Sequence, residues 1–297
     1  MRWFTALAAF MSSKTFDVPP VLLIDEAEQH LHYDAQADLV QMLARQSFAA
    51  KAIYTTHSAG CLPEDLGAGV RIVSQSAESE RSVLRNWFWE DHSVGFTPLL
   101  MAMGATALAF TPSRYALLTE GASDFVLLPL LFREISGREV LGFQIAPGIA
   151  EVAPADVRNL ELEGGRVAYL VDGDDGGVQL KSKLTAQGIP ADRIFSLVRG
   201  SVIEDYVEKG VYLKAVNEEL ARSSQHRVAM RGSDLPASAR PSAVDAWCRG
   251  QRVSAPNRRA VAMQVVEQAQ GGNRVAAAAR RRALEDLLRE IGTRLGL

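Results

Sequence analysis

Residues 115–132 read YALLTEGASDFVLLPLLF and join an apolar, strand-like run to a second apolar run. We predict a strand over 115–119 and a helix over 122–136. Between them, Glu120 and the glycine after it lie at the lip of a buried strand, and Asp124 follows shortly afterwards. Because ligands bind beyond the carboxyl ends of strands in α/β sheets, this junction predicts a functional loop.

The alternation of strand and helix continues toward the C-terminus. The expected elements are a strand at 141–146, a helix at 154–162, a strand at 166–171, a helix at 177–187, a strand at 193–197 and a helix at 203–220. This order is typical of a parallel-sheet α/β unit. A Ser-, Pro- and Arg-rich stretch at 223–243 predicts a loop or linker, and the Ala-rich stretch 273–296 predicts a helix.

The first part of the chain predicts a further α/β region. VPPVLLIDE at 18–26 contains four consecutive apolar residues without alternation, which is typical of a parallel strand buried on both faces. The other expected elements are helices at 2–13, 34–49 and 97–108, a strand at 51–58, and either a hairpin or two edge strands at 70–75 and 82–89. We predict domain limits of 1–110, 111–220 and 221–297, the last an Arg-rich linker followed by a helical segment.

Length and composition indicate a folded, non-membrane protein. The chain has 297 residues, room for about two domains, and 47% of them are hydrophobic. No apolar run reaches the ~18 residues that a membrane-spanning helix needs. The two cysteines, Cys61 and Cys248, lie far apart in the sequence and suggest no disulfide framework, so we expect a cytoplasmic protein.

Charge is unevenly distributed along the chain. Residues 221–297 contain 14 Arg, no Lys and 6 Asp or Glu, a net charge of +8, whereas the chain as a whole carries −3. Residues 1–220 therefore carry −11. A basic C-terminal part attached to an acidic body predicts contact with a polyanion. Solvated helix faces would explain the same charge equally well.

Asp25 and Glu26 end the strand at 18–26, and His57 ends the strand that follows it. An Asp at such a position can hold a Mg²⁺-bound water, and a neighbouring Glu can orient an attacking water. These residues resemble those of the ABC-type ATPases. By that resemblance Asp25 and Glu26 are the Walker B pair, the following EQHLH is the D-loop region, and His57 is the switch histidine.

One part of an ATPase site is missing from the sequence. No G-x-x-x-x-G-K-[ST] motif occurs in the chain, so nothing is expected to cradle the α and β phosphates. The chain therefore resembles the C-terminal part of an ABC-type ATPase domain without its Walker A portion. We expect ATP to bind only with that missing part or with a partner that supplies it, and ATP hydrolysis by this chain alone is not expected.

Acidic residues follow three strands of the second predicted sheet. Glu120 follows the first strand, Asp172 and Asp174 follow a later one in VDGDDGG, and Glu204 opens the segment after a third, in VIEDYV. Carboxylates gathered at one sheet edge form an oxygen-rich pocket that suits Mg²⁺ or Mn²⁺. The alternative for Glu204 and for its neighbour Asp205 is an acid at the amino end of a helix, stabilised by the helix dipole, and Asp175 reads as a turn residue.

The Glu-Gly and Asp-x-Asp pair resembles the Toprim domain of topoisomerases, primases and related nucleases. An ABC-type ATPase followed by Toprim resembles the overcoming lysogenization defect (OLD) nucleases over residues 1–220. That resemblance implies catalytic Glu120, Asp172 and Asp174. It also implies a two-metal Mg²⁺ or Mn²⁺ site made of Glu120, Asp124, Asp172, Asp174 and Glu204. The basic residue that such nucleases use further downstream would be an Arg such as Arg258 or Arg259, because the last lysine is Lys214.

The leading functional hypothesis is a metal-dependent DNA endonuclease or nickase, normally ATP-regulated, in anti-phage defence or DNA processing. Its expected partners are DNA and a second copy of the chain, or a partner supplying the Walker A half. The alternatives are a non-catalytic regulatory or assembly subunit of a split ATPase, and a truncated fragment.

Overall fold

The computed structural model describes residues 18–26, 28, 29, 31–46, 49–63, 65, 69–75, 81–85, 115–147, 166–223 and 228–297. The helices predicted at 2–13, 97–108 and 154–162 lie outside the described residues.

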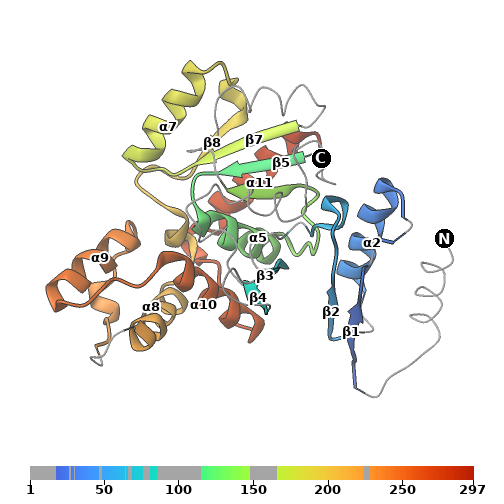
Figure 1. The fold of residues 1–297 in the computed structure, drawn as a ribbon. Coiled ribbons are helices and arrows are strands. Elements are labelled where there is room, and N and C mark those ends of the chain that lie inside the picture. The colour runs from blue at the N-terminus through green and yellow to red at the C-terminus, as the bar shows by residue number, and fades with distance from the viewer. Residues whose placement is uncertain are drawn as a thin grey trace.

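A four-stranded parallel sheet organises the second half of the chain (Figure 1). Its strands are β5 (Tyr115–Thr119), β6 (Gln144–Pro147), β7 (Arg166–Val171) and β8 (Ile194–Ser196), in the order β6-β5-β7-β8. The predicted α/β class and its parallel sheet are confirmed. The strand expected at 141–146 begins later, because Gly142 has a positive φ of 85° and turns the chain before β6.

Helices connect and cover the strands of this sheet. α5 (Ala122–Ser136) links β5 to β6, and α7 (Asp175–Ala186) links β7 to β8. The two connections run toward opposite edges of the sheet. Since such crossovers are right-handed, they place α5 and α7 on opposite faces. α11 (Arg281–Leu295) contacts both α5 and β7, so it shares the face of α5.

The helix predicted at 203–220 is wrong at its beginning. Residues 203–206 form a separate 3-10 turn, η4 (Ile203–Tyr206), and the helix, α8, runs from Lys209 to Ser223. The chain between them is extended, because Val207 pairs with Ala276 in an isolated bridge and the Glu208 amide donates to the Val275 carbonyl at 2.6 Å. Contacts with a distant segment therefore override the local helical pattern.

The C-terminal segment contains more helix than its composition predicted. α9 (Arg240–Gln251) begins inside the stretch expected to be a linker, with Pro241 in its first turn, where proline is tolerated. α10 (Arg258–Gln270) follows. The single helix predicted over 273–296 is wrong at its start, since residues 275–277 pair with residues 206–208 before η6 (Ala278–Arg280) and α11 begin. The helical C-terminus itself is confirmed.

The N-terminal region forms a smaller α/β piece. β1 (Val21–Ile24) and β2 (Lys51–Tyr54) pair in parallel, and α2 (Tyr33–Arg45) connects them. β3 (Ile72–Gln75) and β4 (Ser82–Arg85) pair in antiparallel fashion, as the hairpin alternative for these strands requires. Short 3-10 turns complete the described elements: η1 (Ala59–Cys61), η3 (Ala191–Arg193) and η5 (Gly232–Asp234).

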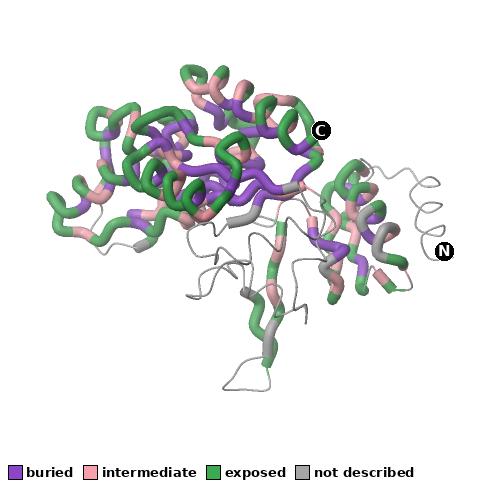
Figure 2. The backbone as a smooth tube through the Cα atoms, turned by 90° about the horizontal axis from the view of Figure 1, so that it is seen from above, coloured by how far each residue is buried: buried purple, intermediate pink, exposed green. Residues whose placement is uncertain are grey.

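Two hydrophobic cores of unequal size hold these parts together. The large core combines the β5–β8 sheet with α5 and the C-terminal helices, and Figure 2 shows the sheet as its buried centre. The small core packs Ile24 against Leu39 and Leu43 under β1 and β2. Leu62 belongs to the large core, so the N-terminal piece is anchored there. Among the described residues, no helix is long and apolar enough to span a membrane.

Candidate functional site

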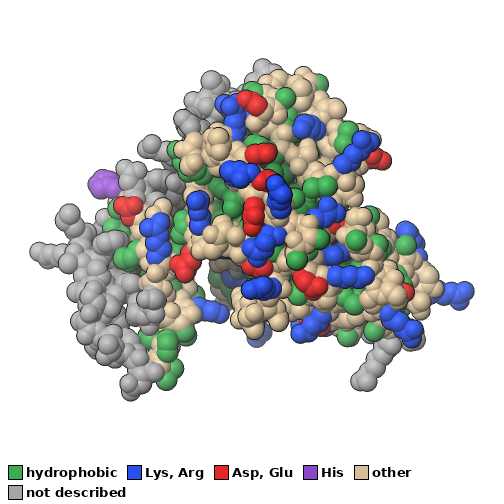
Figure 3. Space-filling model, turned by 180° about the vertical axis from the view of Figure 1, so that it is seen from behind, with side chains coloured by type: hydrophobic (Ala, Val, Ile, Leu, Met, Phe, Trp, Pro, Cys, Tyr) green, Lys and Arg blue, Asp and Glu red, His purple; other side chains and the backbone are tan. Residues whose placement is uncertain are grey.

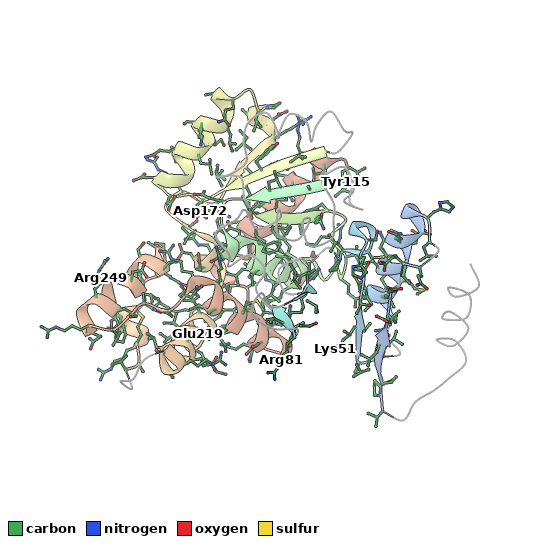
Figure 4. All side chains as sticks on the ribbon, in the orientation of Figure 1. Lys51, Arg81, Tyr115, Asp172, Glu219 and Arg249 are labelled. Carbon is green, nitrogen blue, oxygen red and sulfur yellow. The ribbon has the colours of Figure 1, made fainter. Side chains whose placement is uncertain are left out.

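The sheet order creates a topological switch point between β5 and β7. The chain leaves β5 toward one edge of the sheet and leaves β7 toward the other, so the two loops diverge at the carboxyl ends of these neighbouring strands. In open α/β sheets, ligands bind in the crevice at such a switch point. Glu120 follows β5 and Asp172 follows β7, and Figure 4 shows Asp172 at this end of the sheet.

Glu120 and Asp172 are in direct contact across the switch point. The register of the parallel strands aligns Thr119 with Leu170, which brings the two following loops side by side. The Asp172 backbone amide donates to Glu120 Oε2 at 3.2 Å. The structure therefore brings together the acidic residues of the first two predicted clusters.

Glycine permits the tight path of the loop after β7. A Cβ atom at Gly173 would lie 2.0 Å from the Val198 carbonyl oxygen, so no side chain fits there. The Gly173 amide donates to the Ser201 carbonyl at 2.9 Å, and the Gly200 amide donates to the Gly173 carbonyl at 2.7 Å. The loop carrying Asp172 and Asp174 is thereby fastened to the loop after β8.

Asp124 lies in the first turn of α5 with its side chain buried. Its Oδ2 accepts the Gly121 amide at 2.8 Å, which ties the carboxylate to the glycine that follows Glu120. An acid in this position also interacts favourably with the amino end of the helix dipole. Asp124 thus has a structural role in the loop while remaining near the other carboxylates.

Asp174 differs from Asp172 in its surroundings. It is exposed and caps α7, with its Oδ1 accepting the Gly177 amide at 2.9 Å. A Cβ atom built at Gly176 would be 3.2 Å from Asp174 Oδ1 and 3.9 Å from Glu120 Oε1, so both carboxylates border that glycine. Asp175 is exposed in the first turn of α7.

Glu204 is buried in η4, which packs against α5. Its neighbour Asp205 accepts the amides of Val202, Ala239 and Arg240 at 3.1, 2.9 and 3.1 Å. Arg240 is itself buried and donates to the Glu204 carbonyl at 3.0 Å. Asp205 and Arg240 therefore fix the backbone that carries Glu204, and Asp205 acts as a cap for the start of α9.

Burial and mutual repulsion perturb these carboxyl groups. Burial raises the pKa of Asp124 to about 8, and the charges of Glu204 and Glu120 contribute in the same direction. Burial raises the pKa of Asp172 to about 9, with further contributions from the other four acids. The pKa values of Glu120 and Glu204 are also raised, chiefly by burial. The acids therefore form one electrostatic cluster, in which negative charges disfavour each other.

The fit of this cluster to a metal ion rests on its unsatisfied oxygens. Asp172 Oδ1 is buried and has no hydrogen-bond partner in the part of the chain that the structure describes. All five candidate ligands offer carboxylate oxygens, the donors that Mg²⁺ and Mn²⁺ prefer. Within the described ranges, however, no three His, Cys, Asp or Glu side chains converge closely enough to hold a metal as they stand. The carboxylates are therefore of the chemical type that binds Mg²⁺ or Mn²⁺, but they lie farther apart than the ligands of an occupied metal site.

Of the two basic candidates, Arg258 is the one that the structure relates to this cluster. Its charge opposes the burial effect on the pKa of Glu204 and on that of Tyr212. Arg258 also pairs with Asp245 of α9 at 3.0 Å. Arg259 is the next residue of α10 and is partly buried.

Two residues near Glu204 were missed in the sequence. Ser123 forms a side-chain hydrogen bond with Glu204, which favours the charged carboxylate. Its place beside Asp124 in the quoted EGASD stretch could have singled it out. Arg240 had no such signal, because nothing in ASARPSA indicates a buried guanidinium.

A second polar edge lies at the carboxyl ends of β1 and β2. Thr55 donates its hydroxyl to Asp25 and accepts the Glu26 amide at 2.9 Å. The His57 amide donates to Glu28 Oε1 at 2.6 Å. The parallel register aligns Ile24 with Tyr54, so it brings the predicted nucleotide residues Asp25, Glu26 and His57 to one edge.

The geometry around Glu26 is unusual for a side-chain-bearing residue. Its φ is 47°, in the left-handed region that non-glycine residues rarely adopt. Gln29 donates to Glu26 Oε2 at 2.6 Å and so holds the carboxylate. Strain of this kind is found preferentially at functional sites. Thr55 and Glu28 were not singled out in the sequence, although pairing of the two strands would place Thr55 beside Asp25.

Comparison with known proteins supports the interpretation of the N-terminal region as ATPase-like. The family model described as "AAA domain, putative AbiEii toxin, Type IV TA system" matches residues 1–62. No curated protein matches the chain significantly. The matched stretch contains β1, α2 and β2 together with Asp25, Glu26 and His57. The N-terminal region of this chain is therefore AAA-type ATPase-like.

Proposed function

We propose that the chain is a Mg²⁺- or Mn²⁺-dependent DNA phosphodiesterase, an endonuclease or nickase of the OLD type whose activity is governed by the ATPase-like region. The observation that carries this proposal is the acidic cluster at the β5/β7 switch point. Glu120, Asp124, Asp172, Asp174 and Glu204 are the proposed metal ligands. A role in anti-phage defence or DNA processing rests on the family resemblance alone.

The electrostatics explain how an open cluster would become a metal site. Without a cation, repulsion keeps the carboxylates apart and protonation relieves part of it. Mg²⁺ or Mn²⁺ held by these carboxylates would supply an activated water and stabilise the leaving oxygen of a phosphodiester. Glu120 and Asp172 are the proposed centre of the site, since they already touch across the switch point.

The remaining residues differ in how directly they would take part. Asp174 Oδ1 already accepts a hydrogen bond that caps α7, so Asp174 would bind a metal chiefly through its other carboxylate oxygen. Glu204 would enter from η4, with its backbone fixed by Arg240. Arg258 would supply positive charge beside Glu204 and would thus serve as the downstream basic residue of the site.

Cleavage of supercoiled plasmid with Mg²⁺ or Mn²⁺ tests this proposal. Glu120→Ala and Asp172→Ala should each lower the rate by ~100-fold or more, since even residues outside the ligand shell of a metal commonly contribute 10–100-fold. Asp175→Ala is the matched control, because Asp175 is an exposed acid three residues from Asp172. Equal cleavage by the parent and both site variants would remove the site assignment.

A second function, assembly with an ATPase partner, is favoured by exposed apolar side chains on one face of the β1–β2 sheet. Val21, Leu23 and Ile53 are 56%, 73% and 50% exposed on the side opposite α2. Parallel sheets are normally covered on both faces. The proposed partner is a polypeptide that brings the phosphate-binding loop and completes the nucleotide site.

Leu23→Glu tests this second candidate in ATP-dependent association with an ATPase segment carrying G-x-x-x-x-G-K-[ST]. The charged side chain should abolish association, whereas Val73→Glu, on the equally exposed β3–β4 pair, should leave it intact. Absence of any nucleotide-dependent association by the parent chain would rule the assembly role out.

A further inference from the structure

The acidic cluster raises the question of how a polyanionic substrate could approach it. Five carboxylates at one sheet edge repel phosphate groups, and nucleic-acid binding depends on neutralising cations. The C-terminal segment 221–297 carries a net charge of +8. Where these charges lie relative to the cluster decides whether they can guide a nucleic acid.

Most basic side chains of α11 are neutralised by acidic neighbours. Arg281 pairs with Glu134 and Glu285, each at 3.8 Å. Arg289 pairs with Asp286, and Arg294 pairs with Asp192 at 2.5 Å. On the face seen in Figure 3, Lys and Arg side chains are interleaved with Asp and Glu side chains. This pairing leaves α11 with little net positive potential.

A second group of basic side chains lies between α9 and α10, where Arg258 pairs with Asp245 at 3.0 Å. The segment 249–259, RGQRVSAPNRR, contains four Arg and no acidic residue. Arg249, Arg252 and Arg258 are exposed. Figure 4 shows Arg249 at the outer end of α9. The segment therefore carries a net charge of +4.

The structure relates the start of α9, and the last residues of this stretch, to the acidic cluster. α9 starts at η4, because Asp205 holds the Ala239 and Arg240 amides beside Glu204. α10 starts at Arg258, whose charge acts on Glu204. The α9–α10 connection thus leaves the site along α9 and returns to it at the start of α10.

A further arginine flanks the cluster from the sheet side. Arg199 is exposed in the loop after β8. The next residue, Gly200, donates its amide to Gly173, between Asp172 and Asp174. Arg199 and Arg258 therefore flank the carboxylates from different elements. Arg249, at the outer end of α9, and Arg252 after it extend the basic surface away from the cluster.

We propose that Arg199, Arg249, Arg252 and Arg258 form a contact surface for the sugar–phosphate backbone of a nucleic acid and guide it to the carboxylate cluster. Guanidinium groups bind phosphate oxygens in a planar, bidentate geometry. Phosphate contacts position the strand without selecting its sequence. This inference rests on the proposed function for the identity of the cluster, and it adds the substrate-binding surface.

Binding of a short labelled DNA duplex tests the surface separately from cleavage. Fluorescence anisotropy is measured in EDTA over ~50 to 200 mM salt, a range in which phosphate contacts are strongly screened. Arg249→Gln combined with Arg252→Gln should weaken binding and reduce the slope of log K against log salt by about 1 for each Arg removed. Arg199→Gln should reduce it by about 1.

The matched control is Arg289→Gln combined with Arg294→Gln, which removes the same charge from ion pairs of α11. Thermal melts establish that all variants are folded. Equal affinities and salt slopes for the two double variants would overturn the proposal, as would a parent protein that binds no DNA. The proposal would also be overturned if the Arg249→Gln, Arg252→Gln double variant bound an acidic peptide more weakly than the parent but bound DNA equally well. DNA binding that behaves as predicted in a protein that cuts no plasmid would contradict the proposed function alone.

Discussion

Asp172 is the side chain on which the candidate site most depends. Its amide contacts Glu120, its Oδ1 is buried without a partner among the described residues, and its carboxyl interacts with the other four acids. An ionised carboxylate in this position is costly unless a cation or a proton compensates it. The same residue therefore links the stability of the protein to its proposed chemistry.

Asp172→Asn should stabilise the metal-free protein, and the gain should grow with pH. Because the pKa of Asp172 is raised to about 9 in the folded state, the folded protein holds a proton that the unfolded chain releases near pH 4. Between these values a rise in pH favours unfolding. The substitution removes this effect, so the melting temperature should rise by about 2–4 °C at pH 8.5 for each 1 kcal/mol gained.

Melts in EDTA at pH 5 and pH 8.5 measure this difference. Asp175→Asn is the control and should behave alike at both values, since Asp175 is exposed in α7. If Asp172→Asn changed the melting temperature equally at both pH values, its carboxyl would have an ordinary pKa and the buried cluster would be wrong.

Among individual residues, the sequence predicted the acidic side chains of the site better than the residues that hold their backbone in place. Glu120 and Asp172 follow strands, so the pattern of strand ends was enough to bring them together. The sequence suggested Asp205 as a first-turn acid of the helix predicted at 203–220, whereas the structure shows it capping the start of α9. That role depends on a partner 34 residues away in the sequence, which no local pattern indicates.

The loop after β7 is the element that controls the position of both Asp172 and Asp174. Gly173→Ala should destabilise the protein by about 1–3 kcal/mol, because the new Cβ would meet the Val198 carbonyl and force the two loops apart. Urea unfolding measures this loss. Gly250→Ala is the control: it lies within α9 with open space around it and should gain roughly 0.5–1 kcal/mol. If Gly173→Ala left the free energy of unfolding unchanged, Gly173 would not be packed tightly against the Val198 carbonyl.

The junction of η4 and α9 depends on the buried guanidinium of Arg240. It donates to the Glu204 and Val207 carbonyls at 3.0 and 2.5 Å and lies over the Tyr212 ring. Arg240→Ala should cost about 2–4 kcal/mol, since buried carbonyls lose their donors. Arg249→Ala, on the exposed end of the same helix, should stay within about 0.5 kcal/mol. Equal unfolding midpoints for the two variants would contradict this account of the junction.

Elements with strong local patterns were predicted, and elements fixed by distant contacts were not. β5, α5 and β7 were recognised because their apolar runs are continuous and end in clear turn residues. The break between η4 and α8 was missed, because it depends on pairing of Val207 with Ala276. α9 was missed because Ser, Pro and Arg near its start favour a loop, and its docking through Asp205 is a tertiary effect.

The whole molecule combines an ATPase-like region with the sheet that carries the acidic cluster. Their described contacts include an ion pair at 3.1 Å between Asp65 and Arg133 of α5, together with Leu62 in the large core. α5 also begins at the candidate site, since Asp124 is in its first turn. This helix therefore connects the N-terminal region with the carboxylates. The family match covers only residues 1–62, so sequence comparison leaves the acidic site to physical argument.

Mn²⁺ titration of the whole chain, followed by electron paramagnetic resonance, tests most directly whether the acidic cluster is a metal centre. The parent protein should bind Mn²⁺ saturably. Asp172→Ala should weaken that binding by ~10-fold or more, and Asp175→Ala should leave it unchanged. A parent chain that binds no Mn²⁺, or three proteins that bind it with equal affinity, would contradict the assignment of the β5/β7 switch point as a metal centre.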